Sequence, residues 1–248
     1  MRHGGMPMQN FSAVNLNAGT SYTVTRAAHE QLVALPDRWS DEAKNLERQV
    51  QQWSDAKRRQ ETTLAEIGPR YAECTLDSYR CECDAQTKVV EALKDYAVNA
   101  KQNLQASRNV ILIGPKGTGK DHLLVALSRA VFQEVGVATR WRNGVDLMDE
   151  FHRHALDPDS RPRRDPNIDA DILYVSDPIP PSGALSESKQ TQLFQLVDGR
   201  YRAMRPTWAT MNVFDGAEAE QRMGAQTVDR LRHGALVLFC RWESYRAK

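Results

Sequence analysis

Short apolar runs alternate with stretches of helical periodicity over the C-terminal two thirds of the chain. The runs at residues 110–113, 137–141, 171–175, 207–211 and 236–239 have the length and composition of buried strands. After the first run, Leu123, Leu124 and Leu127 recur at the spacing of one helix face. Alternating strands and helices are typical of a parallel sheet covered on both faces, so the sequence predicts an α/β fold.

A longer helix is predicted before this region, at residues 41–67. Apolar side chains recur there at alternating steps of three and four residues, and only Lys57 and Gln60 interrupt the stripe. A Gly-Pro pair at residues 68–69 ends the pattern. Such a helix packs either on its own domain or on a partner, and the sequence leaves both interpretations open.

Other parts of the chain give weaker patterns. Residues 1–20 are rich in Gly, Asn, Ser and Met without apolar periodicity and are expected to form a flexible tail, followed by a helical region at 21–73. Residues 75–98 are predicted to form the first helix of the main domain. Within residues 145–167, a helix through Phe151 is expected to give way to a basic loop broken by prolines.

Composition limits the class of protein. The 248 residues are 41% hydrophobic, enough for one sizeable core, and 33 Lys and Arg against 32 Asp and Glu give a net charge of +1. The chain as a whole is therefore no electrostatic nucleic-acid binder, and any such contact needs a local patch. The first residues lack the apolar core of a signal peptide and no run is long enough to span a bilayer, so we expect a cytoplasmic protein without a membrane partner.

Three of the four cysteines lie within ten residues: Cys74, Cys81 and Cys83, with Cys240 far downstream. Their spacing lacks the paired C-x₂-C knuckles of a strong zinc site, and the segment holds no histidine. Reduced cytosolic thiols are the favoured interpretation, and zinc binding and a redox role stay open as alternatives.

The strongest chemical signal lies at residues 109–126, which read NVILIGPKGTGKDHLLVA. A glycine-rich loop between a buried strand and a helix turns its N–H groups inward, and the helix N-terminus and a lysine then attract phosphate. This arrangement predicts an ATP site. The residues expected to hold the nucleotide are Gly114, Pro115, Lys116, Gly117, Thr118, Gly119, Lys120, Asp121 and His122.

Two positions of this site depart from the usual pattern for Mg²⁺. Asp121 follows Lys120, where a Ser or Thr hydroxyl normally helps to hold the metal. In the acidic strand end expected at 172–177, Ser176 stands in the metal-associated place and Asp177 in the catalytic one. We expect Asp121, Ser176 and Asp177 to lie around Mg²⁺, with weak metal binding or slow hydrolysis as an open alternative.

Two further polar features follow along the chain. Asn212 closes the run at 207–211, where a polar side chain faces the γ-phosphate in many such sheets, although Asn is also a common turn residue at strand ends. Residues 228–232 offer a helix with two arginines, Arg230 and Arg232, and helical arginines are usually solvated or ion-paired.

The chain from residue 74 onward resembles the DnaC and IstB family of AAA+ ATPases, and within it the helicase-loader branch most closely. The segments that carry the resemblance are CTLDSYRCECDAQ (residues 74–86), GPKGTGKDHL (114–123), RPTWATMN (205–212), DRLRHG (229–234) and WESYR (242–246). The resemblance implies a P-loop NTPase domain of the AAA+ type at 74–248, preceded by a small helical region. Ser176 is the clearest departure, because the family carries an acidic pair at 176 and 177.

The resemblance also implies roles for single residues. Lys120 would bind the β and γ phosphates, Asn212 would sense the γ-phosphate, and Arg246 would act as a second sensor. Arg230 would be an arginine finger, which completes the site of a neighbouring protomer. Self-association is therefore implied, as a helical assembly on single-stranded DNA.

A DNA contact and a protein partner complete what the resemblance implies. The loop after the helix through residue 151 would contact DNA, and the candidate side chains for stacking and phosphate contacts are Phe151, Arg153, Arg161, Arg163 and Arg164. A solvated basic loop is an equally open interpretation. The region before residue 74 would bind the replicative DNA helicase, with the 41–67 helix as a docking element.

The favoured function is an ATP-dependent helicase loader that binds ATP with Mg²⁺, grips the helicase and delivers it to single-stranded DNA. One alternative is a transposition helper ATPase of the IstB type. The other is a nucleotide-binding adaptor with little hydrolysis, which Asp121 and Ser176 suggest.

Overall fold

A computed structural model describes residues 14–17, 20–22, 41–157, 159, 162 and 164–247 of the protein. In chain order the elements are β1 (Val14–Asn17), β2 (Thr20–Tyr22), α2 (Asp41–Ile67), η1 (Pro69–Tyr71), α3 (Asp84–Val98), α4 (Ala100–Gln105), β3 (Val110–Ile113), α5 (Lys120–Val135), β4 (Thr139–Asn143), α6 (Gly144–Leu156), α7 (Pro166–Asp169), β5 (Ile172–Ser176), α8 (Glu187–Arg202), β6 (Thr207–Met211), α9 (Gly216–Met223), α10 (Ala225–Arg232), β7 (Leu236–Phe239) and η3 (Tyr245–Ala247).

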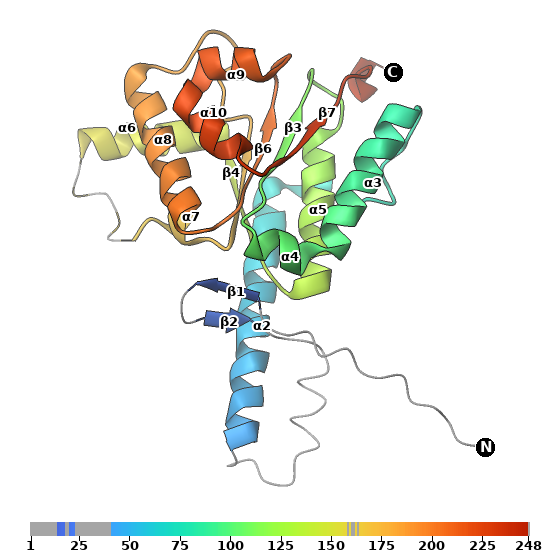
Figure 1. Cartoon of the computed structure of the whole chain (residues 1–248), viewed down its shortest axis with the longest axis vertical. Coiled ribbons are helices and arrows are strands. Elements are labelled where there is room, and N and C mark those ends of the chain that lie inside the picture. Colours follow the sequence, from blue (N-terminus) through green and yellow to red (C-terminus); the bar gives the residue numbers. More distant parts are fainter. Residues whose placement is uncertain are drawn as a thin grey trace.

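Five strands form one parallel sheet in the order β4-β5-β6-β3-β7. Helices cover both faces of this sheet, with α3 and α5 on one side and α8 and α10 on the other (Figure 1). The predicted α/β class is thereby confirmed. Because parallel strands all end at one edge, the loops that follow β3, β5 and β6 lie together there.

Alternate side chains of the inner strands β5, β6 and β3 enter two separate cores. Val110 and Leu112 of β3 belong to the core shared with α3 and α5, whereas Ile111 and Ile113 belong to the core shared with α6, α8 and α10. All four are at most 5% exposed. Burial of each side chain of this size stabilises a fold by about 1.5–3 kcal/mol, so this short strand anchors both layers.

The predicted strands match the sheet closely. β3, β6 and β7 have the predicted bounds. β5 begins one residue later than predicted and β4 begins at Thr139 instead of residue 137. Pairing of these two strands starts at Thr139 opposite Ile172, so the buried Val137 and Ala138 lead into the sheet without joining its ladder.

The α2 helix has the predicted bounds, and its C-terminal half packs on β4. Gln60 accepts a hydrogen bond from Thr139 N at 3.0 Å and donates one to Ser128 Oγ at 3.2 Å, and Thr63 Oγ1 donates to Thr139 O at 2.7 Å. Gln60, one of the two polar residues that interrupt the apolar stripe, is therefore buried against an edge strand, whereas Lys57 is exposed. The N-terminal half of α2 extends away from the sheet domain (Figure 1).

Two helix predictions were wrong at one end. The helix expected at 75–98 begins at Asp84, because Thr75 and Ser78 form a turn in which each side chain accepts a hydrogen bond from the other's N–H. Helix α6 continues past Phe151 to Leu156, where a basic loop was expected. It ends just before Asp157, and the proline at 158 disfavours helical geometry in the residue that precedes it.

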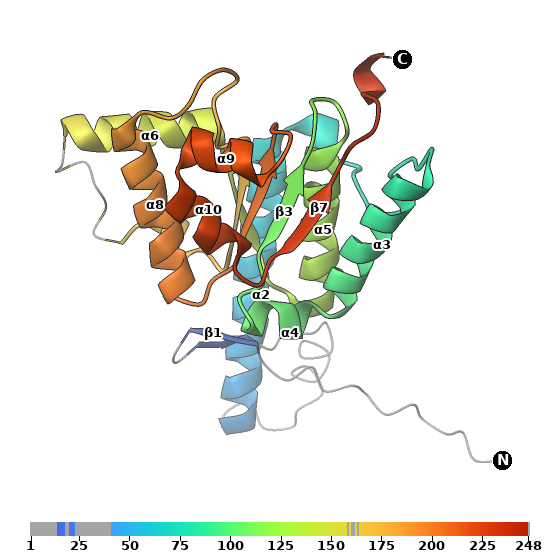
Figure 2. The same cartoon turned by 45° about the horizontal axis from the view of Figure 1, so that its top comes forward.

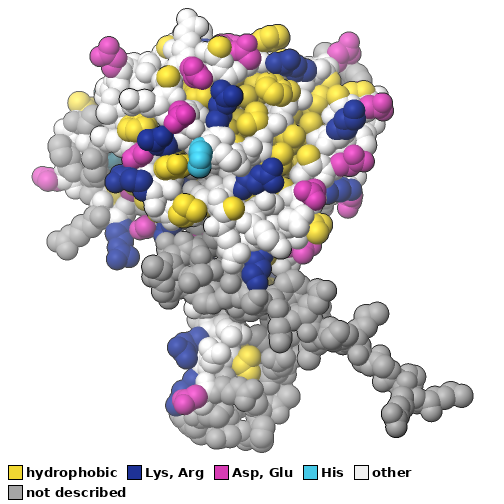
Figure 3. Space-filling view, viewed as in Figure 1, with side chains coloured by type: hydrophobic (Ala, Val, Ile, Leu, Met, Phe, Trp, Pro, Cys, Tyr) yellow, Lys and Arg dark blue, Asp and Glu magenta, His cyan; other side chains and the backbone are white. Residues whose placement is uncertain are grey.

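The predicted tail at 1–20 contains β1, which pairs antiparallel with β2. Its other residues apart from Thr20 lie outside the described residues, and the divisions at 20 and 73 stay predictions. Within the part of the chain that the structure describes, no helix is both long and apolar enough to cross a membrane. On the face shown in Figure 3, apolar side chains gather near β7, an edge strand whose Phe239 is 44% exposed.

Candidate nucleotide-binding site

The glycine-rich loop joins the end of β3 to the start of α5, at the edge of the sheet where β5 and β6 also end (Figure 2). Gly117 and Gly119 have φ of +82° and +83°, a region that other L residues rarely adopt. A Cβ at Gly119 would lie 2.7 Å from the Tyr79 ring, and one at Gly117 would overlap Ser244 Oγ. Neighbouring segments therefore require glycine at both positions.

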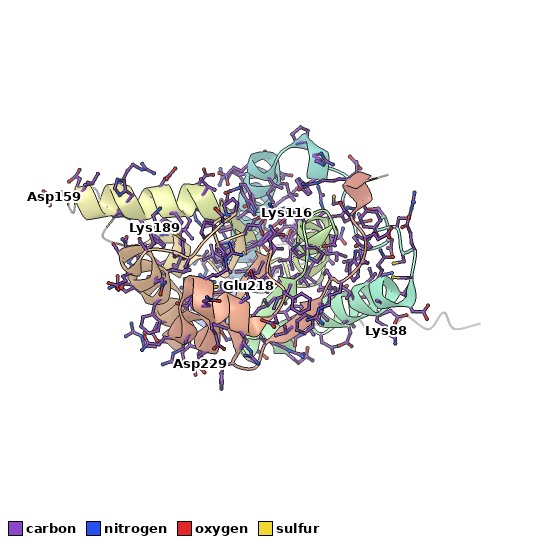
Figure 4. All side chains as sticks on the ribbon, turned by 90° about the horizontal axis from the view of Figure 1, so that it is seen from above. Lys88, Lys116, Asp159, Lys189, Glu218 and Asp229 are labelled. Carbon is purple, nitrogen blue, oxygen red and sulfur yellow. The ribbon has the colours of Figure 1, made fainter. Side chains whose placement is uncertain are left out.

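A cavity of about 790 Å³ opens above this loop, a size that suits a nucleotide. Nine of the predicted site residues line it: Lys116, Gly117, Gly119, Lys120, Asp121, His122, Asp177, Asn212 and Arg246. The cavity is not lined by Gly114, Pro115, Thr118 or Ser176, of which Pro115 is exposed and the other three are buried. Figure 4 looks onto this edge of the sheet and shows Lys116 near α5, with Asp229 at the far margin of the molecule.

Lys120 is held against its own loop. Its Nζ donates to Gly114 O at 2.9 Å, to Pro115 O at 2.8 Å and to Asn212 Oδ1 at 2.8 Å. The residue is 6% exposed, and burial lowers the pKa of its ammonium, an effect that the carboxylates of Asp177 and Asp121 oppose. The structure thus brings the predicted phosphate-binding lysine and the predicted γ-phosphate sensor into direct contact.

Asp121 is the centre of a hydroxyl cluster. Its Oδ1 accepts hydrogen bonds from Tyr174 Oη at 2.6 Å, Ser176 Oγ at 2.8 Å and Thr210 Oγ1 at 3.0 Å. Burial, followed by the Asp121 charge, raises the pKa of the Tyr174 phenol well above its ordinary value, so this group is a permanent donor. The two positions that depart from the usual magnesium pattern, 121 and 176, are therefore in contact with each other.

Asp177 sits one residue beyond β5 in a strained backbone conformation, with φ of +50°. Its Oδ1 is buried and has no hydrogen-bond partner among the described residues. Burial and the nearby Asp121 carboxylate raise the pKa of Asp177 to about 6, against the opposing charge of Lys120. A carboxylate with a raised pKa and an unpaired oxygen is suited to accept a proton from water or to hold a cation.

These oxygen donors fit Mg²⁺. The cavity wall offers the carboxylates of Asp121 and Asp177, and Mg²⁺ usually binds one or two carboxylates, several waters and the substrate phosphates. In the part of the chain that the structure describes, no three His, Cys, Asp or Glu side chains lie close enough together to form a metal site by themselves. The metal that these residues suit is thus one that arrives with a phosphate ligand.

Two distant segments clamp the outside of the loop. Tyr79 Oη and Trp242 Nε1 both donate to Thr118 O, at 2.7 and 3.0 Å, and Tyr245 N donates to Gly117 O at 3.0 Å. The rings of Tyr79 and Tyr245 also meet edge to face. The segments 74–86 and 242–246, which carried much of the family resemblance, therefore meet at the phosphate-binding loop.

Sequence reasoning missed several residues of the site. Arg70, Tyr71 and Arg80 line the cavity from the segment between α2 and α3, and Tyr174 and Thr210 hold Asp121 from within the sheet. Tyr174 and Thr210 could have been noticed in the sequence, because each places a hydroxyl group inside an otherwise apolar strand. The other three gave no signal in the sequence, since a turn of the chain brings them over the loop.

The two predicted arginine roles differ in place. Arg246 lines the cavity. Arg230 lies away from it on α10, where its guanidinium contacts Asp198 at 3.2 Å and covers the Tyr201 ring. Arg230 is therefore not one of the residues that line the cavity of its own protomer.

The predicted DNA contacts need one correction. Phe151 is 6% exposed and belongs to the core with Leu147 and Val197, so its ring is not accessible for stacking on a base. Arg153 and Arg164 are exposed. Arg161 and Arg163 lie outside the described residues.

The four thiols separate into two kinds. Cys74 and Cys240 are buried, and burial raises the pKa of both thiols, whereas Cys81 and Cys83 are exposed. None forms a disulfide. Among the described residues, no group of three or more His, Cys, Asp or Glu side chains could hold a zinc ion.

Comparison with known proteins shows which proteins this chain resembles. A family model described as IstB-like ATP binding protein matches residues 25–248. The replicative helicase loader DnaC of Escherichia coli strain K12 is 28% identical over 189 residues, 73% of each chain. A putative ATP-binding protein of insertion sequence IS232 from Bacillus thuringiensis subsp. berliner is 26% identical over 153 residues, 58% of each chain. A crystal structure of the DnaC helicase loader matches with a TM-score of 0.63 at 19% identity, over 69% of this chain and 99% of that one.

Proposed function

The chain belongs to the IstB-like ATP-binding family, and on that premise we propose that it is an ATP-dependent loader of the replicative DNA helicase. The observation that carries the proposal is the convergence of Lys120, Asp177 and Asn212 on one cavity, beneath the segments that resemble the loader branch. Similarity to a helicase loader over 73% of the chain supports the same function.

In this proposal ATP is bound by the loop amides and Lys120, with Mg²⁺ beside Asp121 and Asp177. The lysine exchanges its contacts with Gly114 O and Pro115 O for phosphate oxygens, which are stronger partners for an ammonium ion. Asn212 already contacts Lys120 and so lies where the γ-phosphate would arrive. Asp177 is the group that orients or deprotonates the attacking water.

Hydrolysis in this proposal needs a second protomer. Arg230 lies outside its own cavity and is held by Asp198 and Tyr201, so it would complete the site of a neighbour. Mixing protomers tests this role. Lys120→Ala subunits, which keep Arg230, are expected to restore hydrolysis when mixed with Arg230→Ala subunits, which keep the phosphate site. Absence of any restoration would contradict action between protomers.

Single-stranded DNA and the helicase are the proposed partners, and the cytoplasm is the proposed compartment. Arg153 and Arg164, exposed at and after the end of α6, are the described side chains that would contact phosphates. The N-terminal half of α2 and the region before it would bind the helicase, because the C-terminal half is already packed on β4.

The test is single-turnover ATP hydrolysis with helicase and single-stranded DNA present, combined with a pull-down from cell extract. We expect Lys120→Ala to abolish hydrolysis and the wild type to recover the helicase. Lys88→Ala is the matched control, since it removes an exposed lysine of α3 that does not line the cavity. An unchanged rate in Lys120→Ala would exclude the enzyme assignment.

A transposition helper ATPase is the second candidate function. The family model and the relative from insertion sequence IS232 favour it. Such a protein would recover a transposase without the helicase and would prefer duplex to single-stranded DNA. Asp121 and Ser176 also favour a third candidate, an adaptor that binds ATP with little hydrolysis, and single-turnover rates separate it from the other two.

A further inference from the structure

Asp121 and Ser176 stand in each other's usual places. In P-loop sites a Ser or Thr follows the lysine on the helix, an Asp ends the neighbouring strand, and both serve Mg²⁺. Here the carboxylate follows Lys120 and the hydroxyl ends β5. We propose that the two residues are an exchanged pair, in which the carboxylate that serves Mg²⁺ comes from the helix and the supporting hydroxyl comes from the strand. This inference rests on the proposed nucleotide site.

The contact between the two side chains is direct. Ser176 Oγ donates a hydrogen bond to Asp121 Oδ1 at 2.8 Å, which links the end of β5 to the first turn of α5. In the sheet, Ser176 is level with Thr210 of β6, and Thr210 Oγ1 donates to the same oxygen at 3.0 Å. A hydroxyl and a carboxylate therefore meet between α5 and β5, as in the usual arrangement. Here, however, the carboxylate belongs to the helix and the hydroxyl to the strand.

The hydroxyl cluster leaves Asp121 able to bind a cation. Three hydroxyl groups donate hydrogen bonds to Oδ1 and fix the orientation of the carboxylate. Among the described residues no donor reaches its second oxygen, and Asp121 lines the cavity. An oriented carboxylate with one open oxygen is the ligand type that Mg²⁺ prefers.

The exchange conserves charge, which explains why both positions differ together. One carboxylate and one hydroxyl lie beside Lys120 and Asp177 in either arrangement. Aspartate at both positions would put two negative charges within hydrogen-bond distance, and like charges that close do not both ionise readily. Serine at both positions would leave Lys120 without one of its two carboxylate neighbours and would remove the acceptor of the buried Tyr174 hydroxyl.

The test is a double-mutant cycle of Asp121→Ser, Ser176→Asp and the two together. The affinity of each variant for a fluorescent ATP analogue is measured with Mg²⁺ and with EDTA, and the ratio of the two affinities is the readout. We expect each single substitution to reduce this ratio by about tenfold or more, and the double substitution to return it to within about threefold of the wild type. Electron paramagnetic resonance of Mn²⁺ with the same analogue should follow the same order.

A role confined to holding the fold would give another result. It would lower the affinities with Mg²⁺ and with EDTA alike, leave their ratio unchanged, and lower the melting temperature of the nucleotide-free protein. Asp84→Ser is the matched control, because it removes an exposed carboxylate from the first turn of α3, as Asp121→Ser does from α5. It should leave the ratio unchanged.

Two outcomes overturn the inference while the proposed function stands: an unchanged ratio in Asp121→Ser, or a double variant no better than the weaker single one. If Asp121→Ser fails to fold, the nearly isosteric Asp121→Asn replaces it in both arms of the cycle, with the same expectation. A wild type that binds no nucleotide would instead refute the proposed function, and with it this inference.

Discussion

Two buried cations show how differently this protein uses positive charge. Arg200, at the end of α8, is fully buried and donates to four backbone carbonyls and to Thr207 Oγ1, at 2.6–3.1 Å. Lys120 is almost as buried, but it borders a cavity of about 790 Å³ and donates to its own loop and to Asn212.

Arg200 and Lys120 differ in whether a ligand can replace the acceptors of their hydrogen bonds. The acceptors of Arg200 belong to α7, the segment after it and the start of β6, so its hydrogen bonds join three parts of the fold. Burial lowers the pKa of this guanidinium to about 9, which still leaves it charged at neutral pH. Lys120 has acceptors that an incoming phosphate can displace. The arginine is therefore a structural cation, and we propose that the lysine is a binding cation.

Arg200→Ala is the strongest way to break this comparison. It should destabilise the free protein by about 3–5 kcal/mol, because it leaves several buried carbonyls without a donor. Urea unfolding followed by circular dichroism measures the change. Arg202→Ala is the control on the same helix end, since its side chain is 74% exposed, and it should cost under about 1 kcal/mol. Equal losses in the two variants would refute the structural role of Arg200.

Lys120→Ala tests whether the lysine serves binding instead of stability. Nucleotide affinity should fall by about a hundredfold or more, on the order of 3 kcal/mol, because the ammonium that pairs with phosphate is lost. The free energy of unfolding should change by about 1 kcal/mol at most, since water in the cavity can satisfy the exposed carbonyls. Titration with a fluorescent ATP analogue measures the affinity, and Lys116→Ala should reduce it only a few fold. A large loss of stability would make Lys120 a second structural cation.

Asp177→Asn sharpens the comparison through pH. The folded state raises the pKa of Asp177 to about 6 from 3.8, so ionisation of this group costs stability as pH rises from about 4 to 6. The variant lacks that cost and should be more stable than the wild type by about 3 kcal/mol at pH 8, with the difference disappearing near pH 4. Thermal unfolding across this range measures it. An advantage that does not vary with pH would point to relief of backbone strain instead.

Arg230→Ala has the smallest expected effect on a free protomer. The side chain is 36% exposed, and its partner Asp198 keeps Arg202 at 2.9 Å, so the stability loss should stay below about 1 kcal/mol. Nucleotide affinity of the protomer should not change. Calorimetric titration checks the second point, and a tenfold loss of affinity would show that Arg230 reaches its own site after all.

Much of the sheet was predictable because its strands are short, apolar and separated by helices. The bounds of β3, β6 and β7 follow from composition alone, and the family resemblance that their flanking segments suggested is confirmed by the match of residues 25–248. Helix ends were less predictable. The start of α3 depends on reciprocal hydrogen bonds between Thr75 and Ser78, which apolar periodicity does not report.

The site was predictable where its residues follow one another along the chain, and less so where the fold assembles them. The loop with Lys120 was visible as a motif, whereas the contact between Asp121 and Ser176 joins residues 55 positions apart. Phe151 was misassigned because a helical aromatic before a basic segment has the same pattern in the core as on a DNA-binding surface. Arg200 gave no signal, since burial of an arginine depends on acceptors from three other segments.

The hydrogen bond from Trp242 Nε1 to Thr118 O has an optical consequence. The emission of an indole depends on its hydrogen bond and on the polarity around it, and this indole is bonded to the backbone of the phosphate-binding loop. The other four of the protein's five tryptophans, among them Trp208 in the core, should contribute a background signal. The protein thus carries its own fluorophore on the outside of the phosphate-binding loop, and occupancy of the loop should be readable without any label.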